Sequence, residues 1–183
     1  EMTKKGLYCS KGSFYIDPTG AVERAVVTHA HADHARPGST HYLCAPETVH
    51  LLKDRIGADI SVQALPYGER LGISNIVLSL HPSGHMLGAA QVKVEQNGEA
   101  WVVTGDYKRT PDPTCLPFEP LRAHVLVTEC TFGLPVFTWP PADQIISAII
   151  AWWETNARAG RTSLLLVYAF GKAQRSIAEL GLR

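Results

Sequence analysis

Short apolar runs, separated by turns and by loops rich in glycine and proline, fill most of the chain up to residue 130. Short segments with many branched or aromatic side chains predict β-strands. The pair Asn97-Gly98 lies between the alternating segments 90–96 and 99–104, which predicts a β-hairpin. By the same pattern we expect strands within 7–16 and at 25–27, 42–44, 60–65, 74–80 and 125–127.

Helices are predicted at 46–56 and 142–159, because each segment begins at or beside a proline and ends before a glycine. A further helix is expected from residue 172 onward. The nearly continuous apolar run 162–169 between them is typical of a strand buried in a parallel sheet. Because composition changes in the proline-rich stretch after residue 133, we expect two domains, 1–133 and 134–183.

Composition narrows the class of protein without identifying it. The 183 residues are 45% hydrophobic and 19% charged, as in soluble globular proteins, and 17 basic residues balance 17 acidic ones. No global positive charge therefore indicates a nucleic-acid partner, although a local channel could still be positive. We expect a cytoplasmic protein with reduced thiols, because the sequence has no signal peptide, no membrane span and four scattered cysteines, Cys9, Cys44, Cys115 and Cys130.

The strongest chemical signal is the segment from His29 to His34, which directly follows the predicted strand 25–27. Side chains alternate along an extended chain, so His29, His31 and Asp33 start out on one side. His34 can join them if the chain turns. Imidazole suits zinc, iron, nickel and copper, and a carboxylate also admits manganese. Three histidines and an aspartate in six residues predict a metal site.

Two later segments repeat this arrangement of strand, loop and polar side chain. His85 lies in a glycine-containing loop after the strand 74–80, and Asp106 follows the strand that ends at residue 104. Loops at strand ends converge over one edge of a sheet, so both side chains are candidate ligands. Asp17 could accept a hydrogen bond from a ligand histidine, or could be an ordinary turn residue before proline.

At these positions the sequence resembles the metallo-β-lactamase superfamily, whose metal-binding motifs are similar to His29-x-His31-x-Asp33-His34, His85 and Asp106. Asp17 matches the aspartate that precedes them in that family. The segments 127–133 and 167–175 resemble the β-CASP region of pre-mRNA 3′-end-cleaving nucleases and ribonuclease J. Residues 133–141, with Trp152-Trp153, look most like bacterial ligase-associated DNA exonucleases.

The resemblance implies an α/β fold, an αββα sandwich followed by the start of an α/β β-CASP domain. It also implies two divalent metal ions, for which zinc is the first choice and manganese is compatible. In the family a later histidine completes the second metal site. No histidine follows His124 here, so we expect the chain to be a fragment of a longer protein. If the ligand roles of that family apply here, one ion would bind His29, His31 and His85, and the other would bind Asp33 and His34. Asp106 would bridge the two ions.

The implied activity is a binuclear phosphodiesterase, and we expect a DNA exonuclease of DNA repair, with a DNA ligase or helicase of the same pathway as a partner. Asp33, Asp106 and Glu129 are the candidate catalytic carboxylates. Lys108 and Arg109 are either phosphate contacts or solvated loop charges. The alternatives are an RNase of the 3′-end-processing or ribonuclease J type, a small-ester metallohydrolase, and a catalytically silent binding subunit.

Overall fold

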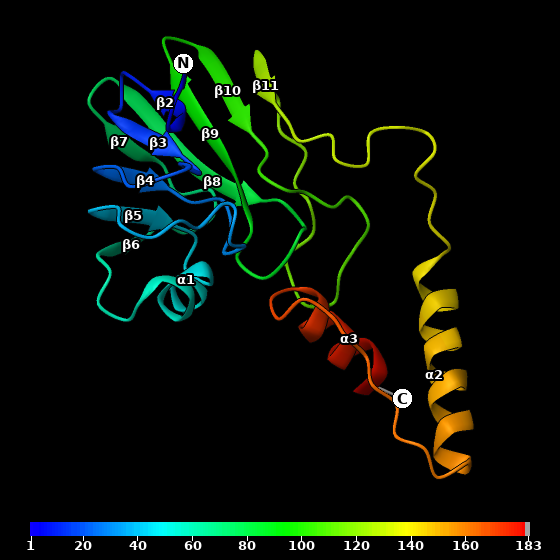
Figure 1. Cartoon of the computed structure of the whole chain (residues 1–183). Coiled ribbons are helices and arrows are strands. Elements are labelled where there is room, and N and C mark those ends of the chain that lie inside the picture. Colours follow the sequence, from blue (N-terminus) through cyan, green and yellow to red (C-terminus); the bar gives the residue numbers. More distant parts are fainter. Residues whose placement is uncertain (182–183) are drawn as a thin grey trace. The chain divides into compact units, whose positions relative to one another are not determined.

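Two β-sheets pack against each other in the first part of the chain (Figure 1). The computed structural model describes residues 1–181 and divides them into two units, Glu1–Glu129 and a second unit that begins at Cys130. The first sheet contains six strands in sequence order: β1 (Met2–Thr3), β2 (Gly6–Cys9), β3 (Phe14–Ile16), β4 (Arg24–Val26), β5 (His41–Cys44) and β6 (Val62–Ala64). Strands β3 to β6 run parallel to one another.

The second sheet has five strands in the order β11-β10-β9-β8-β7. Strands β7 to β10 are antiparallel neighbours, and β11 pairs parallel to β10. Residues Asn97 and Gly98 form the turn of the β9–β10 hairpin, as their sequence predicts. The bounds are β7 (Leu71–Ile73), β8 (Ile76–Pro82), β9 (Ala90–Gln96), β10 (Glu99–Val103) and β11 (Val125–Val127).

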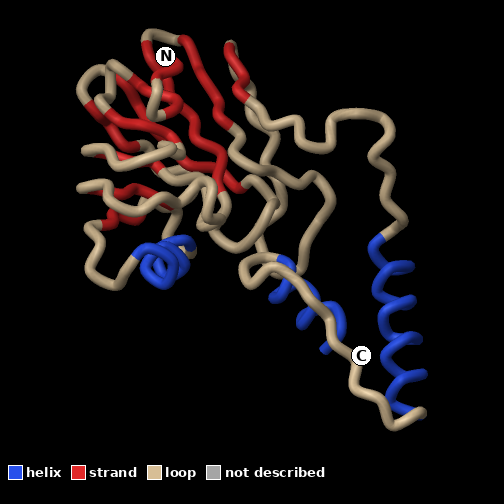
Figure 2. The backbone as a smooth tube through the Cα atoms, viewed as in Figure 1, coloured by secondary structure: helices blue, strands red, loops and turns tan. Residues whose placement is uncertain are grey.

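The core lies between the two sheets because strands β3, β8 and β9 present alternate apolar side chains inward. Phe14 and Val26 from the first sheet join Leu78 and Val92 from the second in one buried cluster. Helix α1 (Thr48–Ile56) follows β5 and fully buries Leu52. Helices and strands are separated by colour in Figure 2, where α1 is the helix beside the first sheet. The first unit is therefore a sandwich of two mixed sheets with few helices.

The second unit contains α2 (Ala142–Arg158) and α3 (Lys172–Gly181). The sequence predicts both helices correctly, and α2 buries Ile146. None of the described helices combines the length and hydrophobicity that crossing a membrane requires.

One expectation needs correction. The run 162–169, predicted as a buried strand, forms no strand, and its side chains are largely exposed, with Leu166 85% exposed. A strand needs a hydrogen-bonded neighbour, and residues 130–181 contain no other strand to supply one. The expected α/β sandwich is confirmed for the first unit, where two mixed sheets pack around one core and α1 is the helix described within residues 1–129.

Candidate metal centre

The loop from Thr28 to His34 begins where β4 ends and is held to both sheets. The Val27 amide donates to the Leu43 carbonyl over 2.8 Å, and the Ala90 amide donates to the Thr28 carbonyl over 2.8 Å. The chain then turns, because the amide of His34 donates to the His31 carbonyl over 3.1 Å. This turn carries the His34 side chain back toward His29, with ring centres 4.1 Å apart.

Four predicted ligands meet at one point. Nδ1 of His31 lies 3.0 Å from Nε2 of His29 and 3.2 Å from Nε2 of His85. Oδ2 of Asp106 lies 3.7 Å from the His29 nitrogen and 3.6 Å from the His85 nitrogen. Ligand atoms about 2 Å from a tetrahedral zinc ion are about 3.3 Å from one another. The three imidazoles and the carboxylate therefore have the chemistry and the spacing of a group that could hold a metal ion.

The other oxygen of Asp106 faces a second pair of side chains. Oδ1 of Asp106 lies 3.3 Å from Nε2 of His34. The same His34 nitrogen lies 3.6 Å from Oδ2 of Asp33, whose side chain is 73% exposed. Asp106 thus lies between two groups of candidate ligands, His29, His31 and His85 on one side and Asp33 and His34 on the other, and the carboxylate of Asp33 is exposed to solvent.

Asp17 holds the loop 28–34 through hydrogen bonds to Thr28 and a close contact with His34. Its Oδ2 lies 2.7 Å from Nδ1 of His34 and accepts a 2.6 Å hydrogen bond from the Thr28 hydroxyl. Its Oδ1 accepts the backbone N–H of Thr28 over 2.8 Å. A carboxylate on Nδ1 leaves Nε2 of His34 turned toward Asp106, which is the arrangement found around many metal-bound imidazoles.

Thr28 contacts the candidate ligands, although the sequence pattern did not single it out. Besides its two bonds to Asp17, its hydroxyl lies 3.1 Å from Nδ1 of the buried His29. Gly105, just before Asp106, allows this crowding: it has a φ of +55°, and a Cβ there would lie 2.7 Å from the Thr28 hydroxyl oxygen. The signal available in the sequence was the position of Thr28 between a strand and the first histidine.

The protonation of these groups reflects burial and close charges. Burial, and then the neighbouring His34, lower the pKa of His29 well below its ordinary value. Burial also lowers the pKa of His85, although Asp106 and Glu129 partly oppose it. For His34 burial acts in the same direction, but hydrogen bonds to Asp106 and Asp17 outweigh it and raise the pKa to about 10. The hydrogen bond to His34 lowers the pKa of Asp106 to about 2.

The remaining predicted residues lie outside the four-atom cluster. Glu129 follows β11 and is close enough to His85 for its charge to oppose, in part, the lowering of the His85 pKa by burial. The ammonium of Lys108 is paired with Oδ2 of Asp112 over 2.9 Å, and Arg109 is exposed. Lys108 therefore fastens the loop after Asp106, whereas Arg109 extends into solvent.

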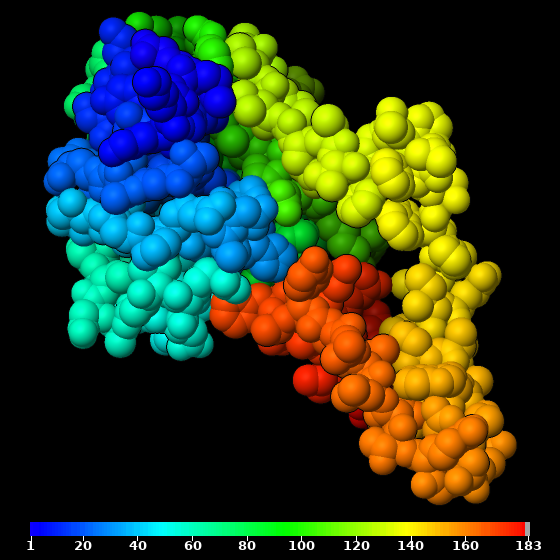
Figure 3. Space-filling model, viewed as in Figure 1, coloured from blue at the N-terminus to red at the C-terminus, as the bar shows by residue number. Residues whose placement is uncertain are grey.

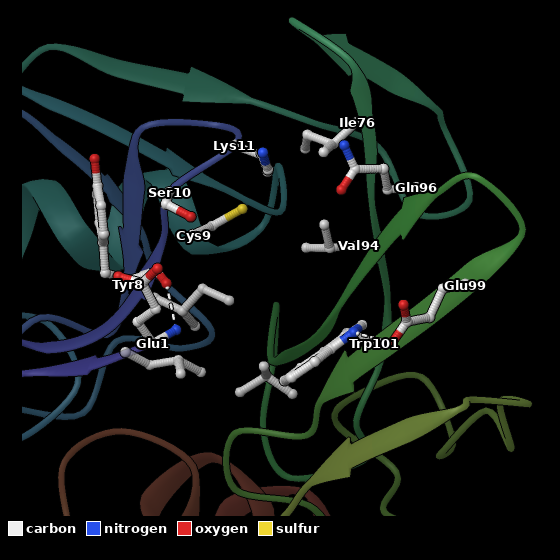
Figure 4. A pocket seen from close by; sticks show the side chains of 13 residues that line it. Glu1, Tyr8, Cys9, Ser10, Lys11, Ile76, Val94, Gln96, Glu99 and Trp101 are labelled. Carbon is white, nitrogen blue, oxygen red and sulfur yellow. Dashed lines mark hydrogen bonds between the residues drawn. The ribbon is translucent and has the colours of Figure 1, made fainter.

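A cavity between the two sheets lies apart from the candidate metal ligands. It has a volume of about 300 Å³ and lies between β2, β9 and β10, with Cys9, Val94 and Trp101 in its walls (Figure 4). The N-terminal residues, dark blue in Figure 3, lie beside the green strands there. None of the predicted metal ligands lines this cavity.

Comparison with known proteins finds relatives that act on nucleic acids. The chain is 30% identical over 184 residues to a probable DNA ligase of Opitutus terrae. It is 29% identical over 170 residues to Endoribonuclease YSH1 of Gibberella zeae, and 27% identical over 177 residues to an RNase J-like protein of Methanocaldococcus jannaschii. These alignments cover 96%, 91% and 84% of the chain, but 17%, 20% and 42% of the respective relatives.

The chain thus spans less than half of the length of each of these relatives. No protein-family model matches it. A solved structure of a protein of unknown function from Enterococcus faecalis superposes with a TM-score of 0.49 at 13% identity, over 73% of this chain and 39% of that one.

Proposed function

We propose that this chain belongs to the metallo-β-lactamase superfamily and forms the metal-binding part of a nuclease of the β-CASP branch, hydrolysing phosphodiester bonds. The observation that carries the proposal is the position of Asp106, whose two oxygens face two histidine-containing groups. The similarity to YSH1 and to the RNase J-like protein supports a nuclease. In this proposal the second unit is the beginning of a β-CASP domain.

Two divalent ions fit the residues that are present. His29, His31, His85 and one oxygen of Asp106 would hold the first ion, and zinc suits this nitrogen-rich set. Asp33, His34 and the other oxygen of Asp106 would hold the second, where the larger share of oxygen also suits manganese. His34 would have to lose the proton that Asp17 and Asp106 stabilise, so loading this set competes with protonation.

When bound, such ions lower the pKa of a water molecule and neutralise negative charge on a phosphate. The protein's own part is to place groups around that reaction. Asp106 fixes the separation of the two ligand sets, and the exposed Asp33 can accept a proton from the attacking water. Glu129, near His85, is a second proton carrier in this proposal.

The substrate we propose is DNA, with the protein acting as an exonuclease of repair. The similarity of nearly the whole chain to a segment of a probable DNA ligase supports this, because a segment joined to a ligase would meet the same substrate. A DNA ligase or a helicase of the same pathway is the partner that follows from it.

RNA is the second candidate, and the relatives support it equally. YSH1 is named as an endoribonuclease, and the archaeal relative is named as RNase J-like. An RNase of the 3′-end-processing or ribonuclease J type would use the same metal ligands.

End-labelled single-stranded and double-stranded DNA and RNA of matched sequence, incubated with the protein and Zn²⁺ or Mn²⁺, test the proposal. Shortening from one end of DNA supports the exonuclease, whereas internal cuts in RNA support the second candidate. Cleavage of a small ester with no cleavage of any polymer would contradict both, and binding without cleavage would identify a silent subunit.

A further inference from the structure

Helix α1 contacts the loops that carry the two halves of the first ligand set. Its first residue, Thr48, is buried, and its hydroxyl donates to the Gly88 carbonyl over 2.7 Å. Near the other end of the helix, Nε of Arg55 donates to the Ala30 carbonyl over 2.5 Å. Gly88 belongs to the loop that carries His85, and Ala30 lies between His29 and His31.

The periodicity of the helix places both donors on the same face. Thr48 and Arg55 are seven residues apart, which is close to two turns and about 10 Å along the axis. Leu52 lies between them on that face and is fully buried. One rigid element therefore spans the distance between the two ligand loops.

Each loop has a backbone group that is suited to this contact. Ala30 is fully buried, so its carbonyl would lack a partner if Arg55 were removed. Gly88 has a φ of +77°, and a Cβ there would lie 2.3 Å from the Thr48 hydroxyl oxygen. A glycine is therefore what lets the end of the His85 loop approach the helix this closely. The Ser83 amide donates to the Ala89 carbonyl over 3.1 Å, so Gly88 and His85 lie in one loop whose two ends are tied together.

We infer that Thr48 and Arg55 are positioning residues for the metal site, and that α1 sets the distance between the His29–His31 loop and the His85 loop. This inference rests on the proposed metal-dependent function. Neither side chain is a metal ligand, and each acts through a backbone carbonyl beside the ligands. Ligand geometry, and hence metal affinity, then depends on a helix that contributes no ligand of its own.

The test measures Co²⁺ affinity and the visible absorption of bound Co²⁺ in the full chain, for wild type and four variants. Thr48→Val removes the hydroxyl with little change in shape, and Arg55→Met removes the guanidinium donors. Lys53→Met is the matched control, since it removes a positive charge from the same last turn of α1. Thr48→Ser restores the hydroxyl and is the rescue variant.

We expect Thr48→Val and Arg55→Met each to raise the Co²⁺ dissociation constant about 10-fold, as for other groups that orient ligands, and to shift the absorption bands. Lys53→Met and Thr48→Ser should stay within about twofold of wild type. Circular dichroism of the metal-free proteins reports whether each variant folds. If Thr48→Val does not fold, the Arg55→Met variant alone tests the inference, because Arg55 is exposed.

Wild-type affinity and spectra in both Thr48→Val and Arg55→Met would overturn the inference and leave the proposed function intact. An equal loss of affinity in Lys53→Met would also overturn it, because the effect would then come from helix charge. A wild-type protein that binds no Co²⁺, Zn²⁺ or Mn²⁺ would instead overturn the proposed function, and this inference with it.

Discussion

Nε2 of His34 lies 3.3 Å from Oδ1 of Asp106, on the opposite side of the carboxylate from His29 and His85. One short side chain thus connects two groups of candidate ligands that come from two other loops. Each oxygen of the Asp106 carboxylate faces a different group of candidate ligands. A side chain that offers a single ligand atom cannot serve both groups. We therefore predict that a substitution of Asp106 weakens metal binding at both groups of candidate ligands.

Asp106→Ala and His31→Ala test this prediction. Asp106→Ala removes a ligand from each set and His31→Ala removes one from the first, so metal affinity should fall by at least about 100-fold and cleavage should be abolished. Metal content by mass spectrometry and cleavage of a labelled oligonucleotide check the result. His41→Ala, which removes an exposed imidazole from β5, is the control. Normal cleavage in either ligand variant would refute the assignment.

Asp17→Asn tests how the loop is oriented. The amide nitrogen of asparagine can donate to Nδ1 of His34, which would leave the proton on Nε2, where a metal would bind. We expect a loss of metal affinity of about 10- to 100-fold with little change in the fold. Isothermal titration with Mn²⁺ and Zn²⁺ measures it. An unchanged affinity would mean that Asp17 is only a turn residue.

The lowered pKa of Asp112, which is not a candidate metal ligand, leads us to predict that the free energy of unfolding depends on pH. Burial would raise the pKa of this carboxyl, but hydrogen bonds from Lys108 and Thr114 outweigh burial and lower it. A lowered pKa in the folded state stabilises the fold above the ordinary value of 3.8, and this stabilisation is lost as the pH falls through the folded-state pKa.

Asp112→Asn should therefore destabilise the protein by about 1 kcal/mol near pH 7. The difference from wild type should shrink as the pH falls below about 4, because the Asp112 carboxyl of the unfolded wild-type chain then binds a proton, which favours unfolding. Urea unfolding at a series of pH values measures both curves. A difference that stays constant down to pH 3 would contradict the assigned pKa shift.

Arg109 and Lys108 should differ in their effect on substrate binding. Arg109 is exposed, whereas Lys108 is held by Asp112. If Arg109 meets a phosphate, Arg109→Gln should weaken binding equally for all sequences and reduce the salt dependence by about one counterion. Fluorescence anisotropy at several salt concentrations checks this. Lys11→Gln, at the cavity between the sheets, removes the same charge as a control.

The clustering of the candidate ligands could be predicted from the sequence because its signal is local. The three side chains of His29, His31 and His34 are confined to one loop, and a strand followed by a loop recurs before His85 and Asp106. Contacts that join distant segments leave no such pattern. The hydrogen bond from Arg55 to Ala30 links residues 25 positions apart and depends on where α1 packs.

The elements of the fold were likewise predictable where their signal is local. Alternation and the Asn97-Gly98 turn identified the β9–β10 hairpin, and proline and glycine marked the ends of α1. The pattern failed at 162–169, where an apolar run indicates burial but cannot supply the neighbouring strand that a β-strand requires. It also missed β7, whose three residues are only partly buried or exposed and give little alternation to read.

The most direct test of the central claim is the number of metal ions bound per chain, measured together with nuclease activity as the metal-free protein is titrated. The account predicts that Zn²⁺ or Mn²⁺ restores cleavage of a labelled nucleic acid as occupancy rises toward two ions per chain. It also predicts that Asp106→Ala lowers metal affinity by at least about 100-fold and abolishes cleavage. Cleavage that persists at zero occupancy, or ions that bind equally well without Asp106, would contradict it.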